Sequence, residues 1–86
     1  MLKPDRTVLR AAILEVVENQ LRDNTPPESK QTFERLVAEG HTTEEARHLI
    51  GVVVACEIYD MLKRGEVYNP VRFIAALKRL PKLPKK

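Results

Sequence analysis

The segment from Thr42 to Gly65 constrains the fold more than any other part of this 86-residue chain. Thr42, followed three residues later by Glu45, forms a capping box, in which each side chain accepts a hydrogen bond from the other residue's backbone N–H. Gly65 marks the end, because glycine adopts the left-handed conformation after a helix without steric cost. No turn signal lies between them, so the sequence predicts one helix over 43–64, about 33 Å long.

The middle of this predicted helix is apolar on almost every side. The run LIGVVVAC, from Leu49 to Cys56, contains no charged residue, and its valines would also suit a buried strand. A helix is favoured because EEARH and EIYDMLKR flank the run without a turn signal. Such a helix is typical of the centre of a bundle. Gly51 and Ala55 are small and four residues apart, so they would let another helix approach closely.

Proline, glycine and asparagine delimit three further helices. Pro26 and Pro27 mark a turn before the second helix, and Gly40 marks its end. Asn69 and Pro70 are typical of the first residues of a helix. The predicted fold is therefore an all-α, compact four-helix bundle with a long central third helix, its helices spanning 5–23, 28–39, 43–64 and 70–80.

The first helix carries more apolar residues than one buried face requires. Leu9, Ile13 and Val17 follow helical spacing, and Ala12 and Leu14 widen the stripe beyond half of the circumference. We therefore expect this helix to touch neighbours on two sides. Because a small monomer has little surface with which to cover two such helices, the sequence predicts a homodimer.

Two contacts are candidates for that dimer. One is the first helix at Leu14, and the other is the face of the third helix that carries Gly51 and Ala55. These three residues are the predicted apolar interaction residues.

The sequence predicts a single domain (1–80) followed by a basic tail (81–86). The charges along this chain are unevenly distributed. All twelve acidic residues precede Val71, whereas six of the fifteen Lys and Arg residues follow it. A basic fourth helix and tail predict nucleic-acid binding as an alternative function. The two prolines of the tail also fit an extended docking segment, and a frayed solubilising end is the simplest interpretation. The six basic interaction candidates are Arg72, Lys78, Arg79, Lys82, Lys85 and Lys86.

The stretch over 36–49 resembles two known helical arrangements. Its short turn at Gly40, with Ala46 following in the next helix, resembles a helix–turn–helix, but Glu44 and Glu45 would then face the DNA phosphates. It also resembles the loop of the ubiquitin-associated domain, where Met-Gly-aromatic precedes Glu-Glu-Ala and where this chain has Glu-Gly-His. Both likenesses are confined to this turn.

A broader likeness extends from Phe33 to Pro81. This region is similar to short, uncharacterised bacterial helical proteins, and the resemblance implies an all-helical fold without implying an activity. The residues that carry it are Arg35-Leu36, Gly40, Glu45-Ala46, Glu57-Ile58 and Leu80-Pro81.

One motif could contribute to a metal site. Glu45 and His48 have the Glu-x-x-His spacing of di-iron carboxylate bundles, in which both side chains share one helix face. Such a site needs a second motif, so a metal-dependent enzyme shared across a dimer, with Glu15 or Glu34 as further ligands, is the second alternative. The simpler interpretation pairs His48 with Glu44, four residues earlier.

Glu57 falls within an apolar stripe of the third helix, where a carboxylate must be paired or must reach solvent. We expect a network in which Glu57 or Asp60 pairs with Arg64, in preference to a catalytic carboxylate. Cys56 is the only cysteine, so the chain forms no internal disulfide.

No nucleophile with a neighbouring base and no phosphate-binding glycine loop is present in the sequence. We therefore predict no catalytic residue and no cofactor. The leading prediction is a small noncatalytic interaction or regulatory module that binds another protein or a second copy of itself. Without a signal peptide or membrane segment, a cytoplasmic location is expected.

Overall fold

The computed structural model describes residues 6–83 of the chain, with side chains from Leu9 onward. It confirms the predicted all-α fold, and each observed helix boundary lies within one residue of its prediction. Asp5, the predicted first residue of the bundle, lies outside the described residues. The helices are α1 (Arg6–Asp23), α2 (Pro27–Ala38), α3 (Thr43–Arg64) and α4 (Pro70–Arg79).

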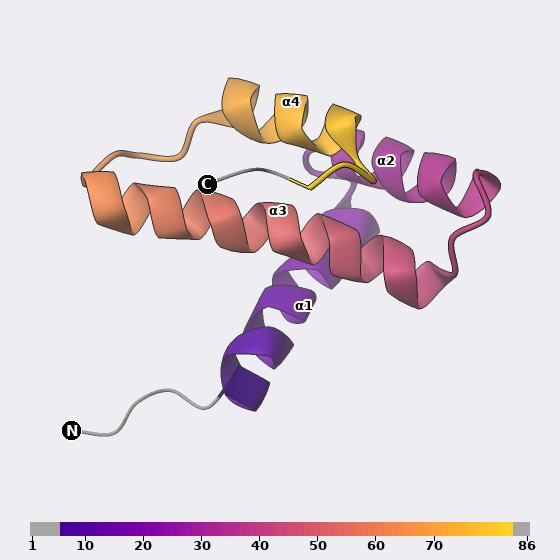
Figure 1. The fold of residues 1–86 in the computed structure, drawn as a ribbon, viewed down its shortest axis with the longest axis horizontal. Helices are drawn as coiled ribbons and strands as arrows, with labels where there is room; N and C mark the ends of the chain where they lie inside the picture. The colour runs from indigo at the N-terminus through magenta and orange to yellow at the C-terminus, as the bar shows by residue number, and fades with distance from the viewer. Residues whose placement is uncertain (1–5, 84–86) are drawn as a thin grey trace.

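The longest helix, α3, packs against each of the other three, as its predicted central position requires. The shorter α2 also contacts all three, whereas α1 and α4 do not contact each other within the described part of the chain. Figure 1 shows α1 crossing α3 steeply, with the start of α1 projecting away from the body, while α4 and α2 lie along the other side of α3. Two opposite faces of α3 are therefore in contact with different helices.

The predicted capping residues fix the ends of α3 and the start of α4. Thr42 Oγ1 accepts a hydrogen bond from the Glu45 amide at 3.0 Å, and Glu45 Oε1 accepts one from the Thr42 amide at 2.9 Å. Gly65 adopts the left-handed conformation with φ of 65°, as expected for a residue that ends a helix. Asn69 Oδ1 accepts from the Arg72 amide at 3.1 Å and caps α4.

The turn between α2 and α3 is a Schellman motif. The amide of His41 donates to the carbonyl of Leu36, and the amide of Gly40 donates to that of Val37, each at 3.1 Å. Gly40 has φ of 107°, a region that side chains with a Cβ rarely adopt. This turn therefore ends α2 in a way that is common among helices.

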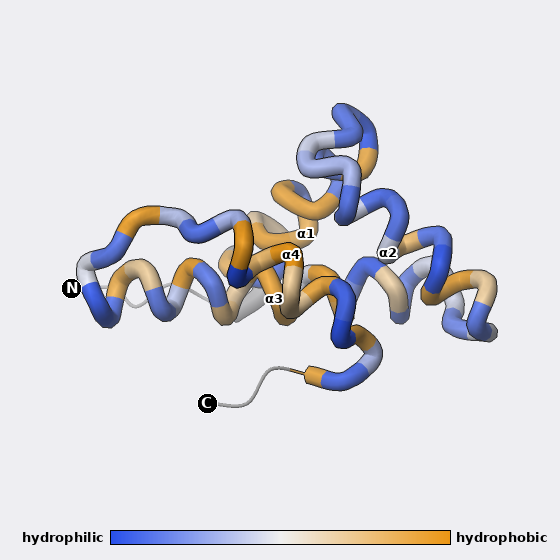
Figure 2. The backbone as a smooth tube through the Cα atoms, turned by 90° about the horizontal axis from the view of Figure 1, so that it is seen from above, coloured by the Kyte–Doolittle hydropathy of each residue, from blue (hydrophilic) through white to orange (hydrophobic). Residues whose placement is uncertain are grey.

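The core lies along α3, where residues of α1, α2 and α4 pack against it, although α2 is mostly hydrophilic (Figure 2). Ala46, Ile50, Val53 and Val54 of α3 are buried, whereas Val17 is the only apolar residue of α1 that is buried among the described side chains. The buried apolar residues are Val17, Leu36, Ala46, Ile50, Val53, Val54, Phe73, Leu77 and Leu80.

The buried face of α2 is partly polar. Ser29 and Thr32 are buried together with Leu36, while Val37 is 38% exposed. Ser29 Oγ donates to Gln20 Oε1 at 2.9 Å, and this bond satisfies the hydroxyl inside the contact with α1.

Candidate functional site

An apolar hollow lies between the first half of α1 and the outer face of α3, and we call it the α1–α3 corner. It consists of two adjoining hollows of about 220 and 420 Å³, which share lining residues from both helices. From α1 the lining comprises Leu9, Arg10, Ile13 and Leu14. From α3 it comprises His48, Gly51, Val52, Ala55, Cys56, Ile58, Tyr59 and Leu62.

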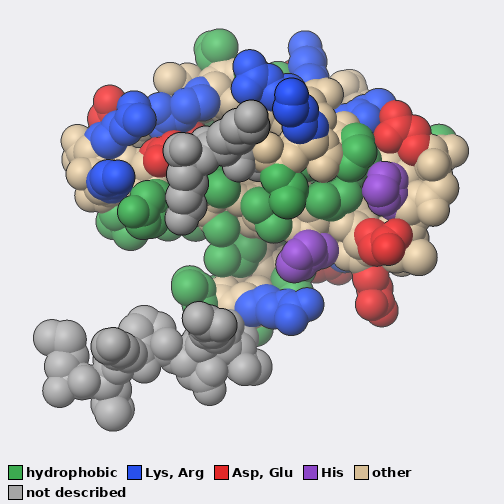
Figure 3. Space-filling model, viewed as in Figure 1, with side chains coloured by type: hydrophobic (Ala, Val, Ile, Leu, Met, Phe, Trp, Pro, Cys, Tyr) green, Lys and Arg blue, Asp and Glu red, His purple; other side chains and the backbone are tan. Residues whose placement is uncertain are grey.

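The corner is open because α1 covers α3 only where the two helices cross. Beyond the crossing, Leu62 is 80% exposed, Tyr59 is 48% exposed and Ile58 is 41% exposed. Leu9, on the opposite wall, is 55% exposed. Figure 3 shows hydrophobic side chains gathered along this side of α3 and toward α1. A contiguous apolar surface of this kind is typical of an interaction site.

At Gly51 the helix that packs on α3 is α1 of the same chain, at a distance that would also admit a Cβ. A Cβ at Gly51 would lie 3.5 Å from Ile13 Cγ2 and 4.0 Å from Leu14 Cδ2. Leu14 is accordingly half-buried at the crossing, and Ala55 lies one turn farther along α3 in the wall of the corner. Of the three predicted apolar interaction residues, Gly51 is therefore buried within the chain, and Ala55 lines the open part.

Positive charge borders the corner, and no carboxylate lines it. Arg10 lines its end near the crossing. Toward the other end, Lys63 Nζ lies 5.7 Å from the centre of the Tyr59 ring, within the range of a cation–π contact. An occupant of this corner would therefore meet an apolar wall between cationic groups.

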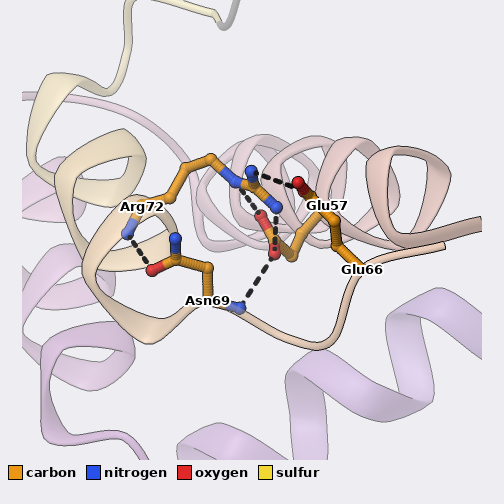
Figure 4. A network of polar contacts seen from close by, with 4 residues as sticks. All are labelled: Glu57, Glu66, Asn69 and Arg72. Carbon is orange, nitrogen blue, oxygen red and sulfur yellow. Dashed lines mark hydrogen bonds and ion pairs between the residues drawn. The ribbon is translucent and has the colours of Figure 1, made fainter. Parts of the chain in front are cut away.

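Glu57 is buried, with its side chain 7% exposed, and it accepts hydrogen bonds from two residues (Figure 4). Arg72 Nε donates to Oε1 at 3.0 Å, and Arg72 Nη2 donates to Oε2 at 2.9 Å. The Asn69 amide also donates to Oε2 at 3.2 Å. The prediction that Glu57 pairs with Arg64 is wrong, since its partner is Arg72. Spacing along α3 cannot reveal that the chain folds back and brings α4 over this carboxylate.

This network holds the start of α4 against α3. The hydrogen bonds from Arg72 keep the pKa of the Glu57 carboxyl below its usual value and outweigh the opposing effect of burial. Glu66 Oε1 lies 3.5 Å from Arg72 Nη1 and adds a second carboxylate to the guanidinium. Burial, together with the negative charge of Glu57, raises the pKa of Tyr68. Both oxygens of Glu57 are committed to structural bonds, so the arrangement suits a clamp and not an acid–base site.

The predicted basic residues divide into two groups. Arg72 belongs to the Glu57 clamp, whereas Lys78, Arg79 and Lys82 are exposed and form no ion pair with a described residue. Lys and Arg side chains gather over α4 in Figure 3. Lys85 and Lys86 lie outside the described residues.

The candidate metal ligands Glu45 and His48 line a shared hollow with His41 and Glu44. Glu45 Oε1 already accepts from the Thr42 amide and lies 3.8 Å from His41 Nδ1. The predicted pair of Glu44 with His48 is not formed. Within residues 6–83, no three His, Cys, Asp or Glu side chains are placed to hold a metal ion.

The start of α3 is negatively charged, which bears on the resemblance to a helix–turn–helix. Glu44 and Glu45 are exposed there, where they favour the helix dipole. Arg47 Nε lies 2.6 Å from Glu18 Oε1, and its guanidinium lies 5.4 Å from the centre of the Phe33 ring. Arg47 is thus already paired within the chain.

Comparisons with protein-family models, with curated proteins and with solved structures gave no match to this chain. Among the described helices, none combines the length and the apolar character needed to cross a membrane. The spacing of apolar residues along the sequence indicated that α1 and α3 each carry more apolar surface than one contact requires. It did not show that these two apolar surfaces meet in the α1–α3 corner.

Proposed function

We propose that this protein is a small interaction module that binds a protein partner through the α1–α3 corner. The observation that carries the proposal is the continuous apolar lining from Leu9 on α1 to Leu62 on α3, without a carboxylate. A groove between two helices is a common receptor for a third helix, which inserts side chains spaced three and four residues apart. The bonds made by Glu57 keep it from serving as an acid or a base.

Site-specific photocrosslinking in the host cell tests this proposal. A benzophenone amino acid replaces Leu62, which is 80% exposed in the corner, and in a matched variant it replaces Val67, which is 84% exposed outside it. We expect a discrete protein adduct from position 62 and none from position 67. The adduct should disappear when Ala55→Glu places a charge on the wall of the corner.

The mass of the adduct distinguishes the possible partners. An adduct of twice the mass of the chain identifies a second copy, whereas another mass identifies a different protein. Absence of any adduct at position 62, or equal adducts at both positions, would contradict docking through this corner.

A second candidate function, nucleic-acid binding, is supported by the end of α4. Lys78, Arg79 and Lys82 project there without carboxylate partners among the described residues, and α4 contains no acidic residue. Phosphate binding by such a cluster weakens steeply as salt concentration rises. Fluorescence anisotropy with duplex DNA and single-stranded RNA should then show binding that Arg79→Glu weakens and that Lys30→Glu, a change of an exposed lysine on α2, does not. Equal effects of the two substitutions would exclude a specific role for α4.

A further inference from the structure

We propose that the occupant of the α1–α3 corner is the same corner of a second copy of this chain, related to the first by a twofold axis. This inference rests on the proposed docking function and names its partner.

The corner defines what its occupant must carry. Its wall on α3 runs from His48 to Leu62, about 21 Å at the rise of a helix, so it accepts roughly four turns. Because the wall is apolar and is bordered by Arg10 and Lys63, the fitting helix has an apolar stripe with a carboxylate beside it. A cationic or fully apolar helix would leave these charges without a partner.

The projecting half of α1 carries both of these features. Leu9, Ala12 and Val16 are spaced three and four residues apart, so they share one helix face, and all three are exposed. Leu9 is 55% exposed and Val16 is 39% exposed. Glu15 is exposed beside this stripe and forms no ion pair with a described residue. One chain thus presents an apolar ridge with a carboxylate beside it and, next to this ridge, an apolar hollow bordered by Arg10 and Lys63.

Adjacency of ridge and hollow favours a closed dimer. Leu9 belongs to both surfaces, since it lines the corner and begins the exposed stripe. A twofold axis near this residue places the α1 ridge of each copy in the corner of the other, and each contact is made twice. The same arrangement covers Leu62, which is 80% exposed in the single chain.

Sedimentation velocity from nanomolar to millimolar concentration tests the inference with the full chain. We expect a reversible monomer–dimer equilibrium. Leu62→Glu should weaken it at least tenfold, because a charge would enter the apolar contact. Val67→Glu, which changes an equally exposed residue outside the corner, should leave the dissociation constant unchanged. Leu9→Glu, on the ridge, should act like Leu62→Glu, and circular dichroism confirms that each variant keeps its helical content.

The charge pattern has its own test. Glu15→Lys should weaken dimerisation about threefold, the usual size of a solvent-accessible ion-pair effect. Glu34→Lys, on an exposed glutamate of α2, is the matched control and should have no effect. An unchanged dissociation constant for Glu15→Lys would overturn the assigned charge pairing.

The single thiol provides an independent signal from inside the corner. Cys56 lines the hollow and is partly exposed, so its rate of reaction with an aromatic disulfide reports access to the site. We expect this rate to fall as the concentration of the wild-type protein rises and to stay constant for Leu62→Glu. A dimer in which the thiol rate does not change would place the contact elsewhere and overturn the inference.

A protein that stays monomeric throughout would also overturn the second copy as occupant. The docking function would still stand if photocrosslinking at position 62 gave an adduct with another protein. The two failures are therefore distinguishable.

Discussion

The two faces of α3 are both apolar, yet their surroundings differ. Ile50, Val53 and Glu57 lie on the face that α2 and α4 cover, and all three are buried. Ala55 and Leu62 lie on the opposite face, which α1 crosses, and there Leu62 is 80% exposed. An apolar pattern therefore shows which side chains are stabilised by burial. It does not show whether another helix of the same chain buries them. The covered face should govern folding stability, and the open face should govern association.

The largest expected effect follows from a truncation on the covered face. Ile50 is fully buried, so Ile50→Ala removes apolar contacts and leaves a cavity. We expect the free energy of unfolding to fall by about 3 kcal/mol. Urea denaturation followed by circular dichroism measures this loss. A loss below about 1 kcal/mol would mean that α2 and α4 do not pack on this face as tightly as the structure indicates.

The next largest effect concerns the clamp on the same face. Glu57→Gln keeps the shape of the side chain and removes the charge that pairs with Arg72, so we expect a loss of about 2 kcal/mol at neutral pH. Glu34→Gln on the surface of α2 serves as the control and should change stability by less than about 0.5 kcal/mol. Equal losses for the two variants would show that the clamp contributes little.

The clamp should also make stability depend on pH. Because the pKa of Glu57 is lowered from 4.5, the unfolded chain binds a proton at this site more readily than the folded chain does. The contribution of the carboxylate is present in full above pH 4.5 and is lost as the pH falls through the lowered value. The difference in stability between the wild type and Glu57→Gln should thus shrink under acid. A difference that grew on acidification would contradict the direction of the shift.

A smaller effect, of opposite sign, is expected where α1 crosses α3. The nearest atom to a Cβ at Gly51 would be Ile13 Cγ2 at 3.5 Å, an ordinary contact distance. Gly51→Ala should therefore raise the free energy of unfolding by about 0.5–1 kcal/mol, since alanine favours the helix.

Gly65 is the matched control for that prediction. Its φ of 65° disfavours any Cβ, so Gly65→Ala should lower stability by roughly 1 kcal/mol. Thermal unfolding of both variants measures the contrast. Destabilisation by Gly51→Ala would mean that the crossing cannot accept a methyl group.

The smallest effect is expected on the open face. Leu62 is 80% exposed, so Leu62→Ala in dilute solution should change the free energy of unfolding by less than about 0.5 kcal/mol. Denaturation at concentrations below the onset of self-association measures this value. A loss near that of Ile50→Ala would show that the chain itself covers this residue.

Much of the fold could be predicted because helix ends are local structures. Thr42 with Glu45, the glycines at 40 and 65, and Asn69 lie within a few residues of the backbone groups that they satisfy. The wide apolar stripes of α1 and α3 also indicated more apolar surface than the chain itself covers. The candidate site was predicted in part, since Leu14, Gly51 and Ala55 all border the crossing or the corner.

What the sequence by itself determined is therefore the helices, their ends and the excess of apolar surface on two of them. The tertiary structure alone decided that Glu57 pairs with Arg72, fifteen residues away, and not with Arg64 on its own helix. It also decided that α1 packs beside Gly51 and leaves Leu62 exposed. The physical reason is that capping and helical periodicity act over a few residues, whereas pairing and cover depend on which helices the loops bring together.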